Sequence, residues 1–295
     1  MKKYAWLLAG VLFPIAAIAA EAPGPGWAFM TPDPNAPAPA AGGGGGGAAV
    51  APPAVQAGAL KIVLGGKGDA VRPCNTCHTP SGMGQPESAN IRGLNADYFV
   101  RQMHDFASGQ RGGPRAGAMA GFAKGLTDDE IKQVAAYYAE LKPAKWTKVT
   151  EAEMAPKTMV GRNSQRTKLP GSDMEQVGMR VIEVAENQAA VRQMVEPAFT
   201  AYVPKGSIAK GRAIATSGGG KAEACTGCHG NKLQGDEDVP SLAGRSPVYI
   251  ARQIYSFKNG IRKGGQADVM KDVVAKLNDE DVVAVASYIS SLNPS

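Results

Sequence analysis

The chain is predicted to be all-α, with two copies of one small helical domain joined by a long, mostly irregular connector. Three observations lead to this prediction. The chain repeats itself at a constant spacing, helix-start residues recur at equivalent places in both copies, and apolar residues follow the helical period after those starts. At 295 residues the chain is long enough for two modest domains.

The repeat is marked by two cysteine motifs, CNTCH at 74–78 and CTGCH at 225–229, which begin 151 residues apart. The same offset, without a gap, aligns residues throughout both copies. The aligned pairs include Gly93 with Gly244, Tyr98 with Tyr249, Gln102 with Gln253, Phe106 with Phe257, Arg111 with Arg262 and Tyr137 with Tyr288. The sequence therefore predicts two copies of one domain, at 58–145 and 205–295.

A middle helix is predicted in each copy from its start and stop signals. Asn95 and Ser246 stand at equivalent positions as N-caps, and the second is followed by Pro247 at the first helical position. Both helices are expected to end at a glycine, Gly109 or Gly260.

The last helix of each copy begins with a capping-box pattern, Thr127 to Glu130 and, more loosely, Asn278 to Asp281. Apolar residues then recur at helical spacing in both copies. They are Ile131, Val134, Ala135 and Tyr138 in the first, and Val282, Val285, Ala286 and Ile289 in the second.

The first 57 residues are predicted to contain a targeting segment followed by a flexible linker. Lys2 and Lys3 precede an apolar run that ends in small residues, so 1–20 is predicted to be a signal peptide. The alternative is an uncleaved anchor, because the run approaches the length that spans a bilayer. Residues 21–57 are rich in Pro, Ala and Gly and are predicted to be a disordered linker. We expect a periplasmic protein, soluble or tethered to the inner membrane.

The formal net charge of +6 comes from scattered Lys and Arg residues, with no basic block and no aromatic ladder beside them. This distribution argues against nucleic acid as a partner. It fits a basic redox protein that meets acidic partners equally well.

The four cysteines, Cys74, Cys77, Cys225 and Cys228, all lie in the two motifs. A redox disulfide of the thioredoxin type needs a strand–helix context that the sequence lacks. Zinc needs four ligands, whereas the second copy holds no histidine or cysteine besides those of its motif. The remaining interpretation is covalent attachment of haem c, with two thiols bonded to one macrocycle and the next residue, His78 or His229, facing the iron.

A second axial ligand is expected from methionine. After His229 the second copy contains one methionine, Met270, and no histidine. The repeat aligns it with Met119 in the first copy, and each methionine follows its motif histidine by 41 residues. The predicted iron ligands are therefore His78 with Met119 and His229 with Met270.

The first copy offers three other candidate ligands. His104 aligns with a tyrosine inside the predicted middle helix and is interpreted as a surface or packing residue. Met83 and Met103 are interpreted as core residues or gap-fillers.

Each copy resembles a class I cytochrome c domain, with an N-terminal helix, the Cys-x-x-Cys-His motif, a middle helix, a methionine loop and a C-terminal helix. The tandem is similar to the di-haem cytochrome c4 and cytochrome c-553 family, as VPSLAGRSPVYIARQIYSF at 239–257 and NDEDVVAVASYI at 278–289 illustrate. The resemblance implies that a proline carbonyl orients the ligating histidine. Pro240 stands at that place in the second copy, whereas the first has Ala89.

The connector, residues 146–204, is longer than such a tandem is expected to need. Its run from Met179 to Val184 has strand character, and Pro and aromatic residues at 197–207 could anchor it. We expect it to wrap against one or both haem domains. The alternative is a solvated spacer.

Closed coordination on both faces of the iron favours single-electron transfer over substrate chemistry. We expect a non-enzymatic electron carrier of the respiratory chain, with redox proteins as partners. The resemblance implies a quinol-oxidising complex or dehydrogenase as the donor and a terminal oxidase or reductase as the acceptor. The alternatives are a cytochrome subunit of a membrane dehydrogenase or oxidase complex and a di-haem peroxidase-type enzyme, which would need an open iron.

Overall fold

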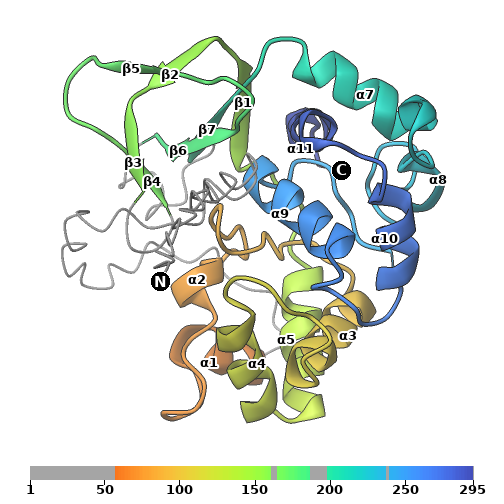
Figure 1. Cartoon of the computed structure of the whole chain (residues 1–295). Helices are drawn as coiled ribbons and strands as arrows, with labels where there is room; N and C mark the ends of the chain where they lie inside the picture. The colour runs from red at the N-terminus through yellow and green to blue at the C-terminus, as the bar shows by residue number, and fades with distance from the viewer. Residues whose placement is uncertain (1–56, 161–164, 187–197, 237–238, 295) are drawn as a thin grey trace, which may run out of the picture.

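A computed structural model describes residues 57–160, 165–186, 198–236 and 239–294. The predicted signal peptide, 1–20, and nearly all of the predicted linker, 21–57, lie outside the described residues. Figure 1 shows three parts: helices α1 to α5, a sheet formed by the connector, and helices α7 to α11. Among the helices described, none has the length and apolar character needed to cross a membrane.

The first helical unit contains α1 (Ala57–Gly65), α2 (Asn75–His78), α3 (Ala96–Ala107), α4 (Ala116–Gly125) and α5 (Asp128–Ala139). The predicted caps are confirmed. The Asn95 side chain accepts a hydrogen bond from the Tyr98 backbone, and Thr127 and Glu130 form a complete capping box. The core lies between α1, α3 and α5, and on α5 it contains the four residues that the helical period predicted, Ile131, Val134, Ala135 and Tyr138.

The second unit contains α7 (Ser207–Ser217), the 3-10 turn η1 (Gly218–Gly220), α8 (Thr226–His229), α9 (Pro247–Lys258), α10 (Ala267–Val274) and α11 (Asp279–Ser291). Ser246 caps α9, and Asn278 with Asp281 forms the capping box of α11. The apolar face of α11 is almost fully buried, with Val282 and Ala286 both 0% exposed. The second copy therefore repeats the helices of the first.

The connector corrects the prediction of an all-α chain with an irregular linker. Its strands are β1 (Thr147–Glu151), β2 (Met154–Pro156), β3 (Thr158–Val160), β4 (Arg166–Lys168), β5 (Met174–Gln176), β6 (Ile182–Ala185) and β7 (Phe199–Val203). Five of them form a mixed sheet in the order β1-β7-β6-β4-β3, while β2 and β5 pair as a separate antiparallel ribbon. The parallel pair β1–β7 joins Thr147 to Phe199 across the whole connector. Local sequence patterns do not reveal such distant pairing.

The sheet packs against both helical units, so the solvated-spacer alternative is wrong. Val181 and Val203 of the connector share a buried cluster with Val248 of α9 and Val283 of α11. Toward the first unit, Trp146 buries its ring in a cluster that includes Met83, and its Nε1 donates to a backbone carbonyl there. Figure 1 shows the strands of the connector beside α7 and α11 of the second unit.

A buried carboxylate joins the sheet to α9. Glu183 on β6 is 2% exposed and accepts hydrogen bonds from the Thr147 hydroxyl at 2.8 Å and the Ser246 hydroxyl at 2.6 Å. The backbone amide of Val248, in the first turn of α9, also points at this carboxylate. Burial nevertheless raises the pKa of Glu183 to about 7.

This raised pKa predicts a pH-dependent stability. Between the ordinary value of 4.5 and about 7, the folded chain keeps a proton on Glu183 that the unfolded chain releases. The contribution of Glu183 to the free energy of unfolding should therefore fall as the pH rises through this window, by up to about 3 kcal/mol for the full shift, while the lowered pKa values of His78 and His229 act in the opposite direction. Urea unfolding at pH 5 and pH 8 measures the difference.

The Glu183→Gln variant should lack this contribution, so the unfolding free energy of the wild type minus that of the variant should be larger at pH 5 than at pH 8. Part of the dependence remains, because burial also raises the pKa of Glu87 to about 7. Glu153→Gln is the matched control, since its exposed carboxylate pairs with Lys205 at the surface. An unchanged slope in Glu183→Gln would contradict the assignment.

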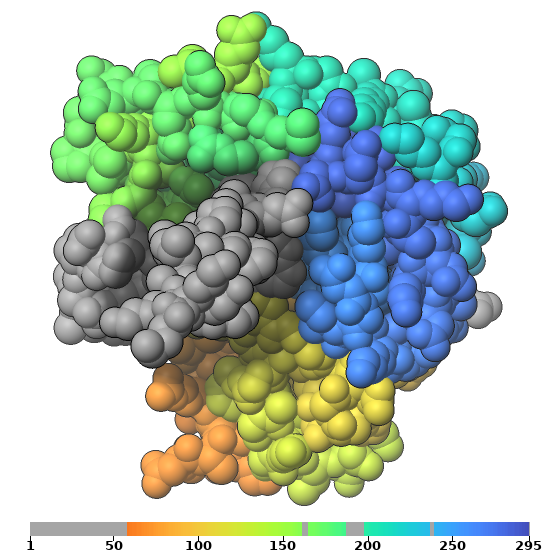
Figure 2. Space-filling model, in the orientation of Figure 1, coloured from red at the N-terminus to blue at the C-terminus, as the bar shows by residue number. Residues whose placement is uncertain are grey.

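The two helical units meet through residues that the repeat had aligned. Arg262 of the second unit donates to the Tyr98 hydroxyl of the first at 2.7 Å, and Arg111 of the first donates to the Tyr249 hydroxyl of the second at 3.0 Å. Both guanidinium groups also donate to Oε1 of Gln102. Figure 2 shows the yellow surface of the first unit lying against the blue surface of the second.

Candidate functional site

Each Cys-x-x-Cys-His motif forms one short helical turn, α2 or α8. The His78 amide donates to the Cys74 carbonyl at 3.0 Å, and the His229 amide donates to the Cys225 carbonyl at 2.9 Å. This turn places the two thiols of each motif three residues apart and sets the histidine directly after the second. The sequence folds this way locally in both copies, as the repeat predicts.

The two thiols of each turn lie in different surroundings. The first thiol, on Cys74 or Cys225, is half-buried against the core of its unit, while the second, on Cys77 or Cys228, is exposed. Burial raises the pKa of Cys74 to about 11 and also raises the pKa of Cys225. All four cysteines are free thiols, so the structure pairs none of them as a disulfide.

The two histidines are oriented in the same way. Nδ1 of His78 lies 2.8 Å from the Ala89 carbonyl oxygen, and Nδ1 of His229 lies 2.8 Å from the Pro240 carbonyl oxygen. A carbonyl only accepts, so Nδ1 carries the proton and Nε2 keeps a lone pair for a metal. Burial lowers the pKa of both imidazoles, which favours the neutral form that binds iron.

Two glycines outside the Cys-x-x-Cys-His motifs, which the motifs do not point to, allow this orientation. Gly84 and Gly235 have positive φ angles of 69° and 86°, and each amide donates to the carbonyl of its motif histidine at 2.9 Å. A Cβ on Gly84 would lie 2.5 Å from the Ala89 carbonyl oxygen, too close for any other residue. The 151-residue offset relates the two glycines and could have identified them.

The two predicted methionine ligands occupy equivalent helices. Met119 lies on α4 and Met270 on α10, so both stand on short helices and not on the expected loops. Each is half-buried and packs against the core of its own unit, the same core that its unit's first motif cysteine contacts. The structure therefore places each methionine against the same core as the first cysteine of its motif.

The other candidate ligands of the first copy are engaged elsewhere. Nε2 of His104 lies 3.1 Å from Asp128, and both side chains are exposed at the surface. Met103 is 5% exposed in the core of the first unit, while Met83 is 2% exposed beneath Trp146. Their placement agrees with the packing roles expected for them.

The donor set fits a haem better than a zinc ion. Within the described ranges, no group of three or more His, Cys, Asp or Glu side chains could hold a metal ion. The Tyr138 hydroxyl is buried without a hydrogen-bond partner, and burial raises its pKa well above the ordinary value, with a smaller effect of Cys74. The fit to haem instead rests on two free thiols and one oriented imidazole in each unit, the donor set of a covalently held haem.

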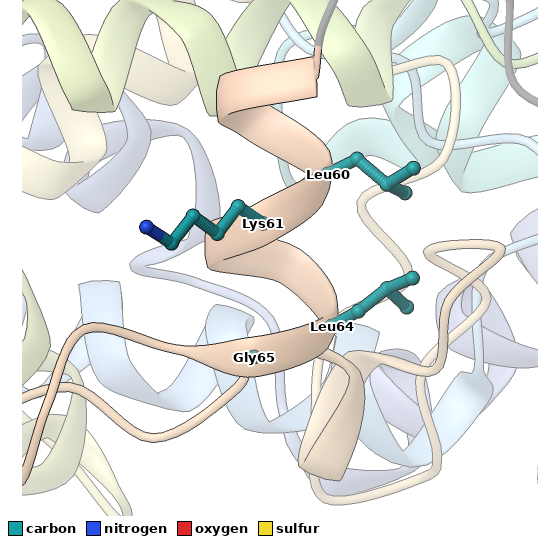
Figure 3. A pocket seen from close by; sticks show the side chains of 4 residues that line it. All are labelled: Leu60, Lys61, Leu64 and Gly65. Carbon is teal, nitrogen blue, oxygen red and sulfur yellow. The ribbon is translucent and has the colours of Figure 1, made fainter.

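A surface hollow of about 430 Å³ lies along α1. It is lined by Leu60, Lys61, Leu64 and Gly65. Figure 3 shows Leu60 and Leu64 on one side of the helix and Lys61 on the other. None of these lining residues carries a thiol, imidazole or thioether, and Leu60 packs against the same core as Cys74 and Met119.

Two family models match the chain, one for each copy of the repeat. The model described as cytochrome c covers residues 208–293, and the model described as cytochrome c oxidase, cbb3-type, subunit III covers residues 65–137. The chain is also 38% identical over 78 residues to cytochrome c-554(548) of Halomonas halodenitrificans, covering 26% of this chain and 94% of that protein.

Longer relatives span both copies. Cytochrome c4 of Azotobacter vinelandii is 27% identical over 230 residues, covering 75% of this chain and 84% of that protein. The thiosulfate dehydrogenase electron acceptor of Stutzerimonas stutzeri is 27% identical over 231 residues, covering 77% and 82%. A solved cytochrome c4 of Acidithiobacillus ferrooxidans shares the fold with a TM-score of 0.52 at 21% identity, over 74% of this chain and 98% of that one.

Each matched cytochrome c domain is of the type that binds one covalent haem c, so the tandem accounts for two haems. The paired motifs and the matched histidine geometry agree with the two family models. They also agree with the matches to cytochrome c-554(548) and cytochrome c4. The chain therefore belongs to the cytochrome c family and consists of two cytochrome c domains, homologous over 75% of its length to the di-haem cytochrome c4.

Proposed function

We propose that this chain is a periplasmic di-haem electron carrier of the respiratory chain. It takes single electrons from a quinol-oxidising complex or a dehydrogenase and passes them to a terminal oxidase or reductase. The observation that carries the proposal is the matched histidine geometry, a 2.8 Å hydrogen bond from Nδ1 to a loop carbonyl in both domains. This arrangement prepares two equivalent sites for iron, one in each domain.

The proposal assigns a role to each site residue. Covalent attachment of the two haems is assigned to Cys74, Cys77, Cys225 and Cys228. Axial ligation of the iron is assigned to His78 with Met119 and to His229 with Met270. A haem held between histidine and methionine supplies reversible one-electron transfer at a raised potential. The protein's part is to close both axial positions, which leaves no place for a substrate on the iron.

The domain division belongs to the same proposal. Residues 58–145 and 205–295 are the two haem domains, and 146–204 is the connector between them. Residues 1–20 serve as a signal peptide or an uncleaved anchor, and 21–57 form the linker. With this arrangement the domains lie in the periplasm, either soluble or tethered to the inner membrane.

Two observations favour a more specific partner as the second candidate. One relative is named as the electron acceptor of a thiosulfate dehydrogenase, and the first domain matches the model of a cbb3-type oxidase subunit. The second candidate is therefore a cytochrome that serves one dehydrogenase or oxidase, as its acceptor or as an attached subunit. Isolation from membranes in a stoichiometric complex would favour attachment, whereas recovery as a free periplasmic protein favours the mobile carrier.

The ligand assignment is tested by visible and near-infrared spectra of the purified protein, oxidised and reduced. We expect two low-spin, methionine-ligated haems, and we expect Met119→Ala and Met270→Ala each to lose one of them. Met103→Leu is the control, because that methionine lies in the core of the first domain. A wild-type haem that is high-spin or lacks sulfur ligation would instead favour the peroxidase-type enzyme.

A further inference from the structure

The two histidine-orienting loops are closed by equivalent backbone hydrogen bonds, but the residue that follows this closure differs. In the second domain, Asp236 and Val239 exchange backbone hydrogen bonds of 3.1 and 2.7 Å directly before Pro240. In the first domain, Gln85 and Ser88 exchange bonds of 3.1 and 2.9 Å before Ala89. The pyrrolidine ring fixes the φ angle of Pro240, whereas the alanine leaves this angle free. The first loop therefore lacks an internal constraint that the second possesses.

Arginines of the second domain contact the first loop on both sides of Ala89. Nη2 of Arg252 donates to the Glu87 carbonyl oxygen at 2.9 Å, and Nη1 of Arg245 donates to the Asn90 carbonyl oxygen. These carbonyls belong to residues two before and one after the alanine whose carbonyl accepts from His78. The two guanidinium groups thus fasten the backbone at both ends of the histidine-orienting segment.

Arg245 is itself held firmly in its own domain. It is 6% exposed, its Nη2 donates to the Ser241 hydroxyl at 2.7 Å, and its Nε donates to the Ser241 carbonyl. The repeat has Leu94 at the equivalent place in the first domain, so this arginine has no counterpart there. Hydrogen bonds from a charged donor are among the stronger ones in proteins.

The connector adds a further contact to the same loop. Nε1 of Trp146 donates to the Gly84 carbonyl oxygen at 3.0 Å, and the indole is 3% exposed. Gly84 begins the loop and Asn90 ends it, so groups from outside the first domain contact it at its start and near its end. The shape of this loop is therefore set by the assembled protein.

We propose that Arg245 and Arg252 are positioning residues for the first haem site, acting from the second domain. By fastening the loop carbonyls on either side of Ala89, they keep the Ala89 carbonyl on Nδ1 of His78, and so keep Nε2 directed toward the iron. They replace the constraint that proline provides in the second domain. This inference rests on the proposed ligation by His78, and it makes the first site depend on domain docking, whereas Pro240 constrains the second loop from within.

The test follows the Nδ1 protons of the axial histidines in the reduced, haem-loaded protein with ¹⁵N-labelled histidine. The chain contains three histidines, and the exposed His104 serves as the fast-exchanging reference. In Arg245→Met, exchange of the His78 Nδ1 proton should become about ten- to a hundredfold faster, the equivalent of losing one hydrogen bond to a charged group. The midpoint potential of the first haem should shift as well, while exchange and potential at the second site stay unchanged.

Two companion variants separate positioning from general stability. Adding Ala89→Pro to Arg245→Met should restore slow exchange and the original potential, because the second domain shows that this turn accepts proline. Arg212→Met removes an exposed charge from α7 and should leave both sites unchanged. If Arg245→Met does not fold, Arg252→Met is examined by the same measurements.

Every outcome of these measurements either supports or overturns the positioning role of the two arginines. Faster exchange confined to His78 and rescued by Ala89→Pro supports the proposal. The proposal is overturned if the exchange rate stays unchanged in the arginine variants or increases equally at both histidines. It is also overturned if Ala89→Pro does not restore slow exchange. A wild-type spectrum without histidine ligation at the first haem would instead reject the proposed function, so the two failures are distinguishable.

Discussion

Replacing Gly211 by alanine is expected to destabilise the second domain by about 3 kcal/mol. Gly211 lies on α7 where this helix crosses α11. A Cβ at this position would overlap the carbonyl oxygen of Ala284 and lie 2.8 Å from Cβ of Tyr288. Neither group belongs to the end of a flexible side chain, so the two helices would have to separate. Urea unfolding of the haem-loaded protein, followed by far-ultraviolet circular dichroism, measures the loss.

Gly117→Ala is the matched control for this prediction. Gly117 lies within α4, and a Cβ there would have no other atom within 4 Å. In an open helical position, alanine is favoured over glycine by up to about 1 kcal/mol, so the control should be neutral or slightly stabilising. If Gly211→Ala were as stable as the control, α7 and α11 would not cross as closely as the structure has them.

The helices and the carbonyl contact that orients each motif histidine were predictable because their causes are local. Thr127 with Glu130 and Asn278 with Asp281 form capping boxes within four residues of sequence, and the structure contains both. The histidine-orienting carbonyl was expected at Pro240 from the family resemblance, and the repeat extends it to the first domain. These features depend on neighbours in the chain, which a sequence displays directly.

The connector sheet was not predictable in the same way. Only the run that became β6 showed strand character, and its partners are β7 and β4. The strand β1 pairs with β7 in parallel, so the hydrogen bonds join segments separated by about fifty residues, from Thr147 to Phe199. Burial of Glu183 follows from this pairing together with α9, and a charged residue in a strand gives no local sign of it. Tertiary packing decided these features.

The contact between the domains was only partly predictable from the sequence. The repeat aligned Arg111 with Arg262 and Tyr98 with Tyr249, but alignment alone did not say that each arginine reaches the tyrosine of the other domain. Repeated residues with no role inside a single copy are candidates for a pseudo-symmetric interface, because two similar surfaces can exchange equivalent contacts. The unrepeated Arg245 carries no such signal, and only the fold reveals its contact.

Arg262→Met is expected to uncouple the two domains. The Arg262 side chain is 7% exposed, its guanidinium lies 4.5 Å from the centre of the Phe257 ring, and it donates to Tyr98 and Gln102 across the interface. Methionine preserves much of the volume but leaves the tyrosine hydroxyl and the glutamine oxygen without this donor in a buried contact. The cost should be about 2 kcal/mol, since the Tyr98 hydroxyl loses its donor while Gln102 keeps the one from Arg111, and a buried polar group that loses its partner costs about 1–3 kcal/mol.

This loss should change the form of thermal unfolding as well as its midpoint. Calorimetry of the haem-loaded wild type is expected to give one cooperative transition, because the interface and the sheet tie the domains together, and Arg262→Met should give two. Arg111→Met removes the equivalent contacts to Tyr249 and Gln253 from a less buried position, so its effect should be smaller. Because both arginines donate to Gln102, the effects of the two variants should not add. A single transition with an unchanged midpoint in Arg262→Met, indistinguishable from Arg212→Met, would show that the domains stay coupled without this arginine, through the connector sheet and the contacts of Arg111, Arg245 and Arg252.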